Sequence, residues 1–486
     1  MDGNGSGSGS GRGTTVAVVS RPAARYVLEA PFDPPNPVYE MVETALRTIG
    51  LDRARAGTPE WNPLGDLVAR GDRVVVKPNF VASRNFHERL RGEGLACSST
   101  HGSVLRPILD YALRAAGPRG SVCVVDTPVE GCDLEDVVEG LGVGDLLRWY
   151  RSRGRSVELL DLRHFRVVPR MLLDDARRMG RSWNLGLLLR ERLAGDPRGY
   201  AVVDLGERSR FAEVARRGER LRFHRSHQRT PAPHHVGGRH EYSIPRTLLE
   251  ADVVVNIPKM KTHKKSGVTL ALKSCMGLTN EKYWLPHYTA GTPARDGDEY
   301  PEAPPFAVRW ENRLQRFPLP FDHSLIARAP RLDDGGARAG MLHGWIVEGS
   351  WQGNDTVWRT ALDLNRILFH ADRDGRLRDG APLRRYLAIV DGIVAGEGEG
   401  PLASTPRNAG LLVAGCDPAL VDLACLRAMG LCEDAVPMVR RAFDVPLLPG
   451  SHADALRVAL DGPAPHGRFA PPSTWPALLG PAEPLA

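Results

Sequence analysis

The sequence feature that most constrains the fold of this chain is a short apolar run followed directly by lysines. Residues 253–257 are mostly β-branched and lie between Asp252 and Pro258, which is typical of a buried strand. Six of the seven lysines lie between residues 251 and 283, although Lys and Arg together number 64. Because ligands bind beyond the carboxyl ends of strands in open α/β sheets, the pattern predicts an anion or substrate site here. An ordinary solvated basic loop is the alternative.

Short apolar strands alternate with amphipathic helices over most of the chain. Helices are predicted at residues 38–49, 104–115, 134–150, 268–276, 356–370 and 417–429. Strands are predicted at residues 15–20, 73–77, 121–125, 156–162, 200–205, 253–257, 386–390 and 409–414. This order predicts an α/β fold with a mixed, mainly parallel sheet flanked by helices and interrupted by a large irregular insertion.

Composition divides the chain into five stretches. Residues 1–13 form a Gly/Ser tail expected to be disordered, and residues 14–278 and 346–462 form the two parts of the α/β core. Residues 279–345 are an insertion rich in Trp, Tyr and Pro, for which a lid over the lysines is one interpretation. Residues 463–486 are rich in Pro and Ala and are expected to form a loosely attached tail.

Charge and cysteine usage narrow the class of protein. The formal net charge is 64 − 58 = +6 and 42% of the residues are hydrophobic, so a disordered chain is excluded and nucleic-acid binding is not required. Seven cysteines occur without a CxxC motif, which favours reduced thiols over a zinc or iron–sulfur site. No run of 18 apolar residues and no signal peptide are found, so a cytoplasmic location without a membrane partner is expected.

Two further stretches carry polar residues at predicted strand ends. Lys77 ends the strand at 73–77 and is followed by Asn79. Thr100 and His101 precede the helix at 104–115, where they would cap the helix or help its amino terminus to bind an anion. His287 lies near the start of the insertion and is expected to face the same site.

An acidic, glycine-rich segment follows the predicted strand at 386–390. It carries Asp391, Glu397 and Glu399 among four glycines, so it is expected either to bind Mg²⁺ or sugar-like hydroxyls or to form a flexible acidic turn. Five histidines crowd residues 224–240, but their spacing matches no familiar zinc pattern, and a solvated Arg-rich loop is favoured there.

Four blocks of the sequence resemble the bacterial and archaeal DUF362 family, a domain of unknown function. They are VVVKPN at 74–79, LLEADVVVNIPKMKTH…VTLALKSCMGL at 248–278, LAIVDGIVAGEGEGP at 387–401 and LLVAGCDPALVDLACLRAMG at 411–430. The resemblance implies that the Lys/His loop and the acidic loop form one site. Ser274 stands where family members often have Asn, and the iron–sulfur cysteines of some relatives are missing, so no such cluster is expected.

These features predict an enzyme that acts on a phosphorylated or carboxylated small molecule, in a step of specialised metabolism. His263, Lys261 and Lys273 are the expected catalytic residues. The expected substrate-binding residues are Lys77, Asn79, Thr100, His101, Lys259 and His287, and the expected Mg²⁺ ligands are Asp391, Glu397 and Glu399. The reaction is left open among group transfer, isomerisation and hydrolysis, and the oligomeric state is open as well. The alternatives are a non-catalytic binder of nucleic acid or protein, with nucleic acid disfavoured, and a redox protein related to the iron–sulfur relatives.

Overall fold

A computed structural model describes residues 14–83, 85, 94–171, 186–223, 233–303 and 349–485. The tail expected over residues 1–13, most of the insertion expected over 279–345, and His224 and His227 lie outside the described residues. Within the part of the chain that is described, no helix is both long and apolar enough to cross a membrane.

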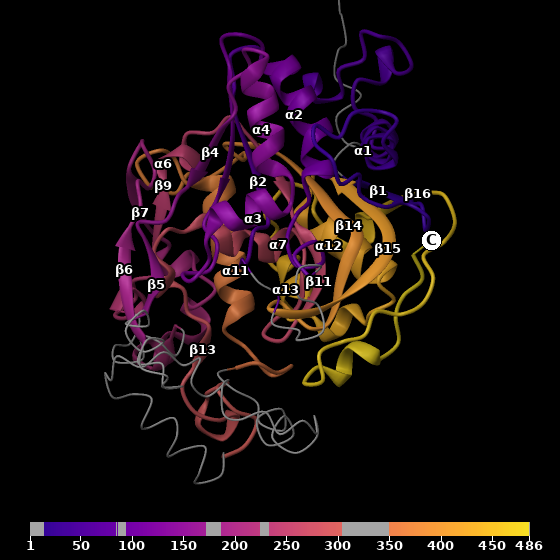
Figure 1. Ribbon diagram of the computed structural model, residues 1–486. Helices are drawn as coiled ribbons and strands as arrows, with labels where there is room; N and C mark the ends of the chain where they lie inside the picture. The colour runs from indigo at the N-terminus through magenta and orange to yellow at the C-terminus, as the bar shows by residue number, and fades with distance from the viewer. Residues whose placement is uncertain are drawn as a thin grey trace, which may run out of the picture.

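A sheet of 10 strands forms the centre of the molecule (Figure 1). Eight strands lie side by side in the order β16-β1-β15-β14-β10-β2-β3-β4, and within this row only β15 runs against the others. The predicted mixed, mainly parallel sheet is therefore confirmed. The strands of the row are β1 (Thr15–Ser20), β2 (Arg73–Pro78), β3 (Ser121–Asp126), β4 (Glu158–Asp161), β10 (Val253–Ile257), β14 (Arg385–Glu399), β15 (Ala403–Gly415) and β16 (Arg457–Asp461).

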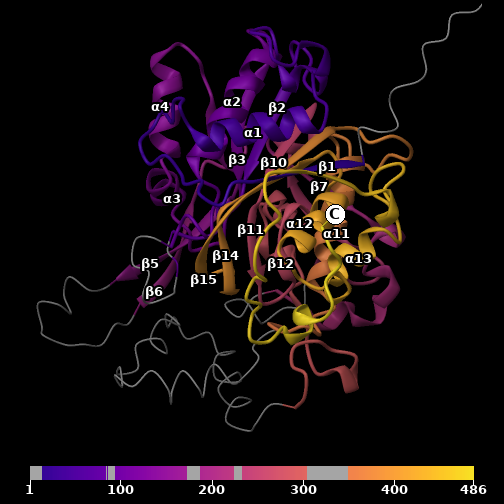
Figure 2. The same cartoon turned by 90° about the vertical axis from the view of Figure 1, so that its right-hand side faces the viewer.

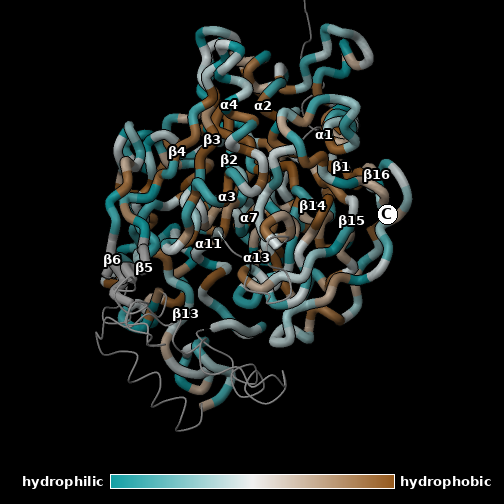
Figure 3. Tube along the Cα trace, in the orientation of Figure 1, coloured by the Kyte–Doolittle hydropathy of each residue, from teal (hydrophilic) through white to brown (hydrophobic). Residues whose placement is uncertain are grey.

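Helices cover both faces of this sheet, so its strands are apolar on both sides (Figures 2 and 3). Val74 and Val76 of β2 pack into one core, whereas Val75 packs into the other. The first core is covered by α1 (Pro37–Thr48), α2 (Gly102–Ala116), α3 (Leu134–Gly140) and α4 (Val143–Ser152). The second is covered by α6 (Arg246–Leu249), α7 (Ala271–Ser274), α11 (Val357–His370), α12 (Pro418–Ala428) and α13 (Pro437–Ala442).

Three small antiparallel sheets extend from this body. Residues 163–245, where the sequence pattern is weak, supply most of their strands, including the predicted strand near residues 200–205. The pairs are β5 (Phe165–Met171) with β6 (Gly186–Arg192), β7 (Tyr200–Asp204) with β9 (Glu241–Pro245), and β8 (Leu221–Arg222) with β13 (Tyr288–Thr289).

Two predicted helices are divided in the structure. The helix expected over 134–150 is split into α3 and α4 because Gly142 adopts a left-handed conformation with φ of 68°. The helix expected over 268–276 begins instead with β12 (Gly267–Thr269), and α7 starts only at Ala271 because Leu270 is extended. Periodicity alone does not separate such short elements.

The two segments expected to be loops are strands. The lysine-rich segment forms β11 (Lys259–His263), which runs parallel to β14 and pairs with β12. The acidic segment is the second half of β14. Its glycines serve close packing rather than flexibility: a Cβ at Gly396 would lie 2.6 Å from the Cys97 carbonyl oxygen, and one at Gly400 would lie 2.1 Å from that of Thr262.

The carboxyl-terminal segment packs against the body, so the expectation of a loosely attached tail is wrong. Phe469, Trp475 and Leu478 belong to the second core, and Trp475 is only 1% exposed. The indole N–H of Trp475 donates to the carbonyl oxygen of Lys264 at the turn between β11 and β12. The Pro/Ala-rich composition concealed a few apolar anchors, and these determine where the segment lies.

Candidate functional site

Strand alternation places Lys259, Lys261 and His263 on one face of β11, all of them buried. On the opposite face, Met260 packs into the second core and the Thr262 hydroxyl donates to the carbonyl oxygen of Gly398. Pro258 ends β10, and β11 continues beside β14 beyond this break. The lysines thus lie at the carboxyl edge of the parallel strands, where the sequence predicts a site.

Lys259 forms a fully buried ion pair with Asp391. Its Nζ lies 3.0 Å from a carboxylate oxygen of Asp391 and 2.6 Å from the Tyr26 hydroxyl oxygen. Asp391 also accepts hydrogen bonds from the Tyr26 hydroxyl at 2.6 Å and from the backbone N–H of His101 at 3.2 Å. Burial lowers the pKa of Lys259, and the Asp391 charge opposes that shift. Both members of this pair are 0% exposed and neutralise each other, so the pair acts as structural support.

His101 also has a structural position. Its ring stacks on Tyr26 with 4.1 Å between centroids, and its Nδ1 accepts the backbone N–H of Ser103 at the start of α2. Burial lowers the pKa of His101 to about 4, so the ring is neutral near pH 7. The geometry therefore agrees with helix capping, which is one of the two interpretations of this residue.

Lys77 belongs to a second buried ion pair. Its Nζ lies 3.0 Å from a carboxylate oxygen of Asp126 and donates to the carbonyl oxygen of Pro78 at 2.9 Å. Nearby, Lys282 donates to the Thr127 hydroxyl at 2.7 Å, and burial lowers the pKa of Lys282 to about 7. A Cβ at Gly277 would lie 2.6 Å from the Asp126 carboxylate, so only glycine fits against this pair.

Lys261 is buried without a carboxylate partner among the described residues. Its Nζ donates to the side-chain oxygen of Asn79 at 2.9 Å and to the carbonyl oxygen of Ser98. Thr100 fixes this contact, because its hydroxyl accepts the Asn79 backbone N–H at 2.9 Å and donates to the carbonyl oxygen of Ile257 at 2.7 Å. Burial, followed by the charge of Lys259, lowers the pKa of Lys261 well below its ordinary value.

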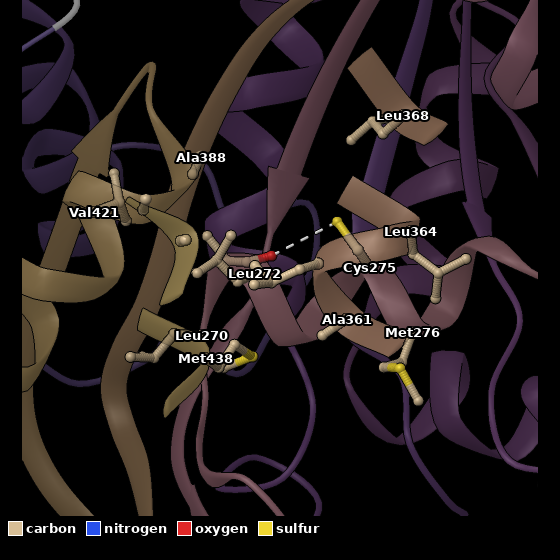
Figure 4. Close-up of a cluster of buried hydrophobic side chains, with 14 of the residues drawn as sticks. Leu270, Leu272, Cys275, Met276, Ala361, Leu364, Leu368, Ala388, Val421 and Met438 are labelled. Atoms are coloured by element: carbon tan, nitrogen blue, oxygen red, sulfur yellow. Dashed lines mark hydrogen bonds between the residues drawn. The ribbon is translucent and has the colours of Figure 1, made fainter. Parts of the chain in front are cut away.

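Lys273 lies on α7, a four-residue helix whose backbone is held by buried side chains. The Asp422 carboxylate accepts the N–H groups of Ala271 and Leu272 at 2.6 and 3.0 Å. The amides of Asn256 and Asn365 donate to the carbonyl oxygens of the same two residues, at 3.0 and 2.9 Å. Around α7, the apolar residues of this segment pack against α11, α12 and α13, as Figure 4 shows for Leu270, Leu272, Cys275, Met276, Ala361, Leu364, Val421 and Met438.

The ammonium group of Lys273 is the exception among these buried lysines. The side chain is 9% exposed, and it makes neither a hydrogen bond nor an ion pair with any residue that the structure describes. Burial and the charge of Lys265 lower the pKa of Lys273 to about 8. A buried cation without a partner is unusual and marks a candidate ligand-binding position.

The pKa of His263 is affected by the charges of several of these lysines. Its Nδ1 accepts the backbone N–H of Lys265 at 3.0 Å. Burial lowers the pKa of His263 well below its ordinary value, and the charges of Lys273, Lys261, Lys265 and His287 lower it further. The neutral ring therefore carries its proton on Nε2. We call these five residues the cationic cluster: Lys261, His263, Lys265, Lys273 and His287.

The three carboxylates expected to share a cation are dispersed along β14. Asp391 pairs with Lys259, Glu397 with Arg407 at 3.0 Å, and Glu399 with Lys264 at 2.6 Å. No group of three or more His, Cys, Asp or Glu side chains suited to a metal ion occurs among the described residues. The expected grouping of these carboxylates is therefore wrong, because the segment is an extended strand whose acids meet separate cations rather than a loop that folds around an ion.

The described part of the histidine-rich stretch contacts aromatic rings. His234 stacks on Trp284 with 3.4 Å between centroids, and His235 and His240 lie against Phe211. The Nε2 of His235 bonds to the carbonyl oxygen of Trp284 at 2.8 Å. These rings form part of the packing around β9.

Some residues that shape the site carry no recognisable signal in the sequence. Tyr26 lies in an irregular segment before α1, 365 positions from the Asp391 to which it bonds. Asn256 and Asn365 read as interior residues of a strand and a helix. Asp422 lies one turn into α12, and its carboxylate supports α7.

Replacing Lys273 with methionine is expected to stabilise the protein at neutral pH. The pKa of about 8 lies below the 10.5 of an ordinary lysine, so the unfolded chain binds this proton more tightly than the folded one. The charged form therefore costs stability at all pH values below about 8, and the cost fades as the pH rises toward 10.5. The free energy of unfolding of Lys273→Met at pH 7 is expected to exceed that of the wild type by up to roughly 3 kcal/mol.

Urea denaturation at pH 7 and pH 10 measures this difference, which should shrink at the higher pH. Lys259→Met is the matched control. It leaves the buried carboxylate of Asp391 without its cation and is therefore expected to destabilise the protein at pH 7. A loss of stability in Lys273→Met at pH 7 would show that Lys273 has a stabilising partner.

Comparison with known proteins gives one family match. Residues 194–427 match the model of a family described as a domain of unknown function, DUF362. No curated protein matches the chain. Among solved structures, the chain is similar to the crystal structure of a protein from Thermotoga maritima, with 10% sequence identity and a TM-score of 0.29. That similarity covers 79% of this chain and 56% of the other, so the chain spans little more than half the length of that protein.

Proposed function

We propose that this chain, whose residues 194–427 match the DUF362 family, is an enzyme that binds an anionic small molecule at the cationic cluster. The description of that family assigns no activity. The proposal rests on a difference between the buried lysines, namely whether a carboxylate pairs with the ammonium group. Lys77 and Lys259 each have an aspartate, whereas Lys261 and Lys273 have no carboxylate partner among the described residues. A phosphate or carboxylate from a ligand would supply the missing negative charge.

Burial supports a small ligand over a macromolecular partner. Lys261 is 0% exposed and Lys273 is 9% exposed, so a nucleic-acid backbone or a protein surface would not reach both. The binding-protein alternative needs an exposed lysine-rich loop, and here this segment is an interior strand. A ligand of the size of a metabolite, held in a water-poor surrounding, would feel the lysine charges strongly.

His263 is the proposed acid/base group. With Nδ1 committed to the Lys265 backbone, its Nε2–H is the one that would donate to a ligand. A bound anion would offset the surrounding positive charges and raise the pKa of this ring from its depressed value. Proton transfer through Nε2 is therefore coupled to anion binding. The dispersed acids of β14 have no role in this proposal.

The supporting parts of the site fix these groups in place. The Lys259–Asp391 pair and the Thr100–Asn79 contacts position β11 and the Lys261 ammonium, and the polar contacts of α7 position Lys273. Such preorganisation is what a catalytic site requires. A cytoplasmic location is part of the proposal, because an odd number of cysteines without CxxC suits reduced thiols.

A thermal-shift screen of phosphorylated and carboxylated metabolites tests the proposal. A true ligand is expected to raise the melting temperature of the wild type and to do so much less in Lys261→Met. Lys264→Met is the matched control, because Lys264 follows β11 in the same hairpin but pairs with Glu399. Equal shifts in all three proteins would mean that the anion binds elsewhere. If no anion stabilises the wild type at millimolar concentration, the proposal is wrong.

A further inference from the structure

Lys273 has the structural features of a reacting amine. It is nine-tenths buried, unpartnered among the described residues, and attached to a helix whose backbone is fixed by Asp422, Asn256 and Asn365. A lysine with only a structural role would be expected to have a carboxylate partner, as Lys77 and Lys259 each have at 3.0 Å. The fold instead keeps this ammonium apart from every described acid.

Lys282 is another buried lysine, and it differs from Lys273 in its hydrogen bonds. Burial lowers the pKa of Lys282 to about 7, below that of Lys273 at about 8. However, Lys282 donates to the Thr127 hydroxyl and to the carbonyl oxygen of Met276, at 2.7 and 3.1 Å. The Lys282 nitrogen thus donates to two protein oxygens, whereas the Lys273 nitrogen donates to none among the described residues.

We infer that Lys273 forms an imine with the carbonyl carbon of an anionic aldehyde or ketone held by the cationic cluster. The inference rests on the proposed function and adds the substrate class: a compound with a carbonyl group near a carboxylate or phosphate. Lys261 and Lys265 hold the anionic group, and Lys273 reaches the carbonyl. The depressed pKa of Lys273 leaves a useful fraction of neutral amine near pH 7 to 8, where an ordinary lysine has almost none.

The step balances without a further reactant. The neutral Nζ attacks the carbonyl carbon and forms the C–N bond as the C=O π bond breaks, and the Nε2–H of His263 donates a hydrogen bond to the developing oxyanion. One proton of the attacking nitrogen passes to this oxygen and gives a neutral carbinolamine. The second proton of the nitrogen then passes to the hydroxyl oxygen, which leaves as water while the C=N bond forms. Amine and carbonyl become imine and water, with no change in oxidation state.

Reductive trapping on the full-length protein tests the inference. The protein is incubated with glyoxylate or with glycolaldehyde phosphate in the presence of sodium cyanoborohydride, and the modified lysines are identified by peptide mass spectrometry. We expect Lys273 to be modified at least tenfold faster than Lys282 or Lys264, with a rate that rises with pH to a plateau above about 8. The two probes distinguish a carboxylate-bearing from a phosphate-bearing carbonyl compound. Lys273→Met should lose this modification.

The outcomes separate this inference from the proposed function. Propionaldehyde, which has no anionic group, is expected to trap Lys273 far more slowly than either anionic probe. Equal trapping by propionaldehyde would keep the reactive amine but overturn the anion site. If an anion stabilises the wild type in the thermal screen and yet neither probe modifies Lys273 preferentially, the imine is wrong and anion binding stands. Preferential modification of Lys282 would likewise overturn the inference.

Discussion

Replacing Asp391 with alanine is expected to lower the free energy of unfolding by about 4 kcal/mol. The variant leaves the fully buried ammonium of Lys259 without its carboxylate and removes the acceptor for the Tyr26 hydroxyl and the His101 backbone N–H. Urea denaturation measures the change. Glu397→Ala is the control, because the pair of Glu397 with Arg407 is partly exposed and its loss should cost only about 1 kcal/mol.

A double variant separates the contribution of the ion pair to the free energy of unfolding from the cost of changing two buried side chains. Lys259→Met together with Asp391→Leu removes both charges, so the pair of substitutions should cost several kcal/mol less than the sum of the single ones. Additive losses would mean that the two side chains do not depend on each other. That result would contradict the role of this pair in holding β11 beside β14.

Replacing Trp475 with alanine is expected to lower the free energy of unfolding by about 4 kcal/mol as well. Its ring is buried in the second core, and its N–H donates to the Lys264 carbonyl oxygen at the turn of the β11–β12 hairpin. Trp475→Phe keeps most of the packing and should cost only about 1–2 kcal/mol. Leu479→Ala, at a side chain that is 49% exposed, is the control and should change stability by less than about 0.5 kcal/mol.

Thermal denaturation of the three variants gives the order of these effects. If Trp475→Ala melts like the wild type, the carboxyl-terminal segment does not support the hairpin. The same variants also bear on ligand binding, because Trp475 holds the turn that follows His263. Weaker anion binding in Trp475→Ala at a temperature where it remains folded would show this support directly.

The sheet and its neighbours could be predicted from the sequence because their signals are local. Alternation of apolar runs and helical faces identified β1, β2, β3 and β10 with nearly their observed bounds, and the rule on strand ends placed the lysines correctly. The break at Pro258 was also recognisable, but the return to strand at Lys259 was not. It depends on pairing with β14, whose glycines are more than a hundred positions away.

The roles of the individual lysines could not be predicted for a related reason. Lys77, Lys259 and Lys273 look alike in sequence, each next to an apolar run. What distinguishes them is whether an aspartate from another element reaches the ammonium: Asp126 reaches Lys77 and Asp391 reaches Lys259. These partners lie 49 and 132 positions away, and only the tertiary fold brings them together. The absence of such a partner among the described residues singles out Lys273.

The position of β1 has a consequence for how the protein is made. β1 is the first strand among the described residues, yet it lies between β15 and β16, with Ala17 opposite both Ala414 and Ala459. A nascent chain therefore exposes this apolar strand until β15 and β16, about four hundred residues later, have left the ribosome, an interval on the order of half a minute at ordinary rates of synthesis. Such a long-range closure makes folding slow and leaves an unpaired edge open to other chains. Chaperone dependence during expression is the expected outcome.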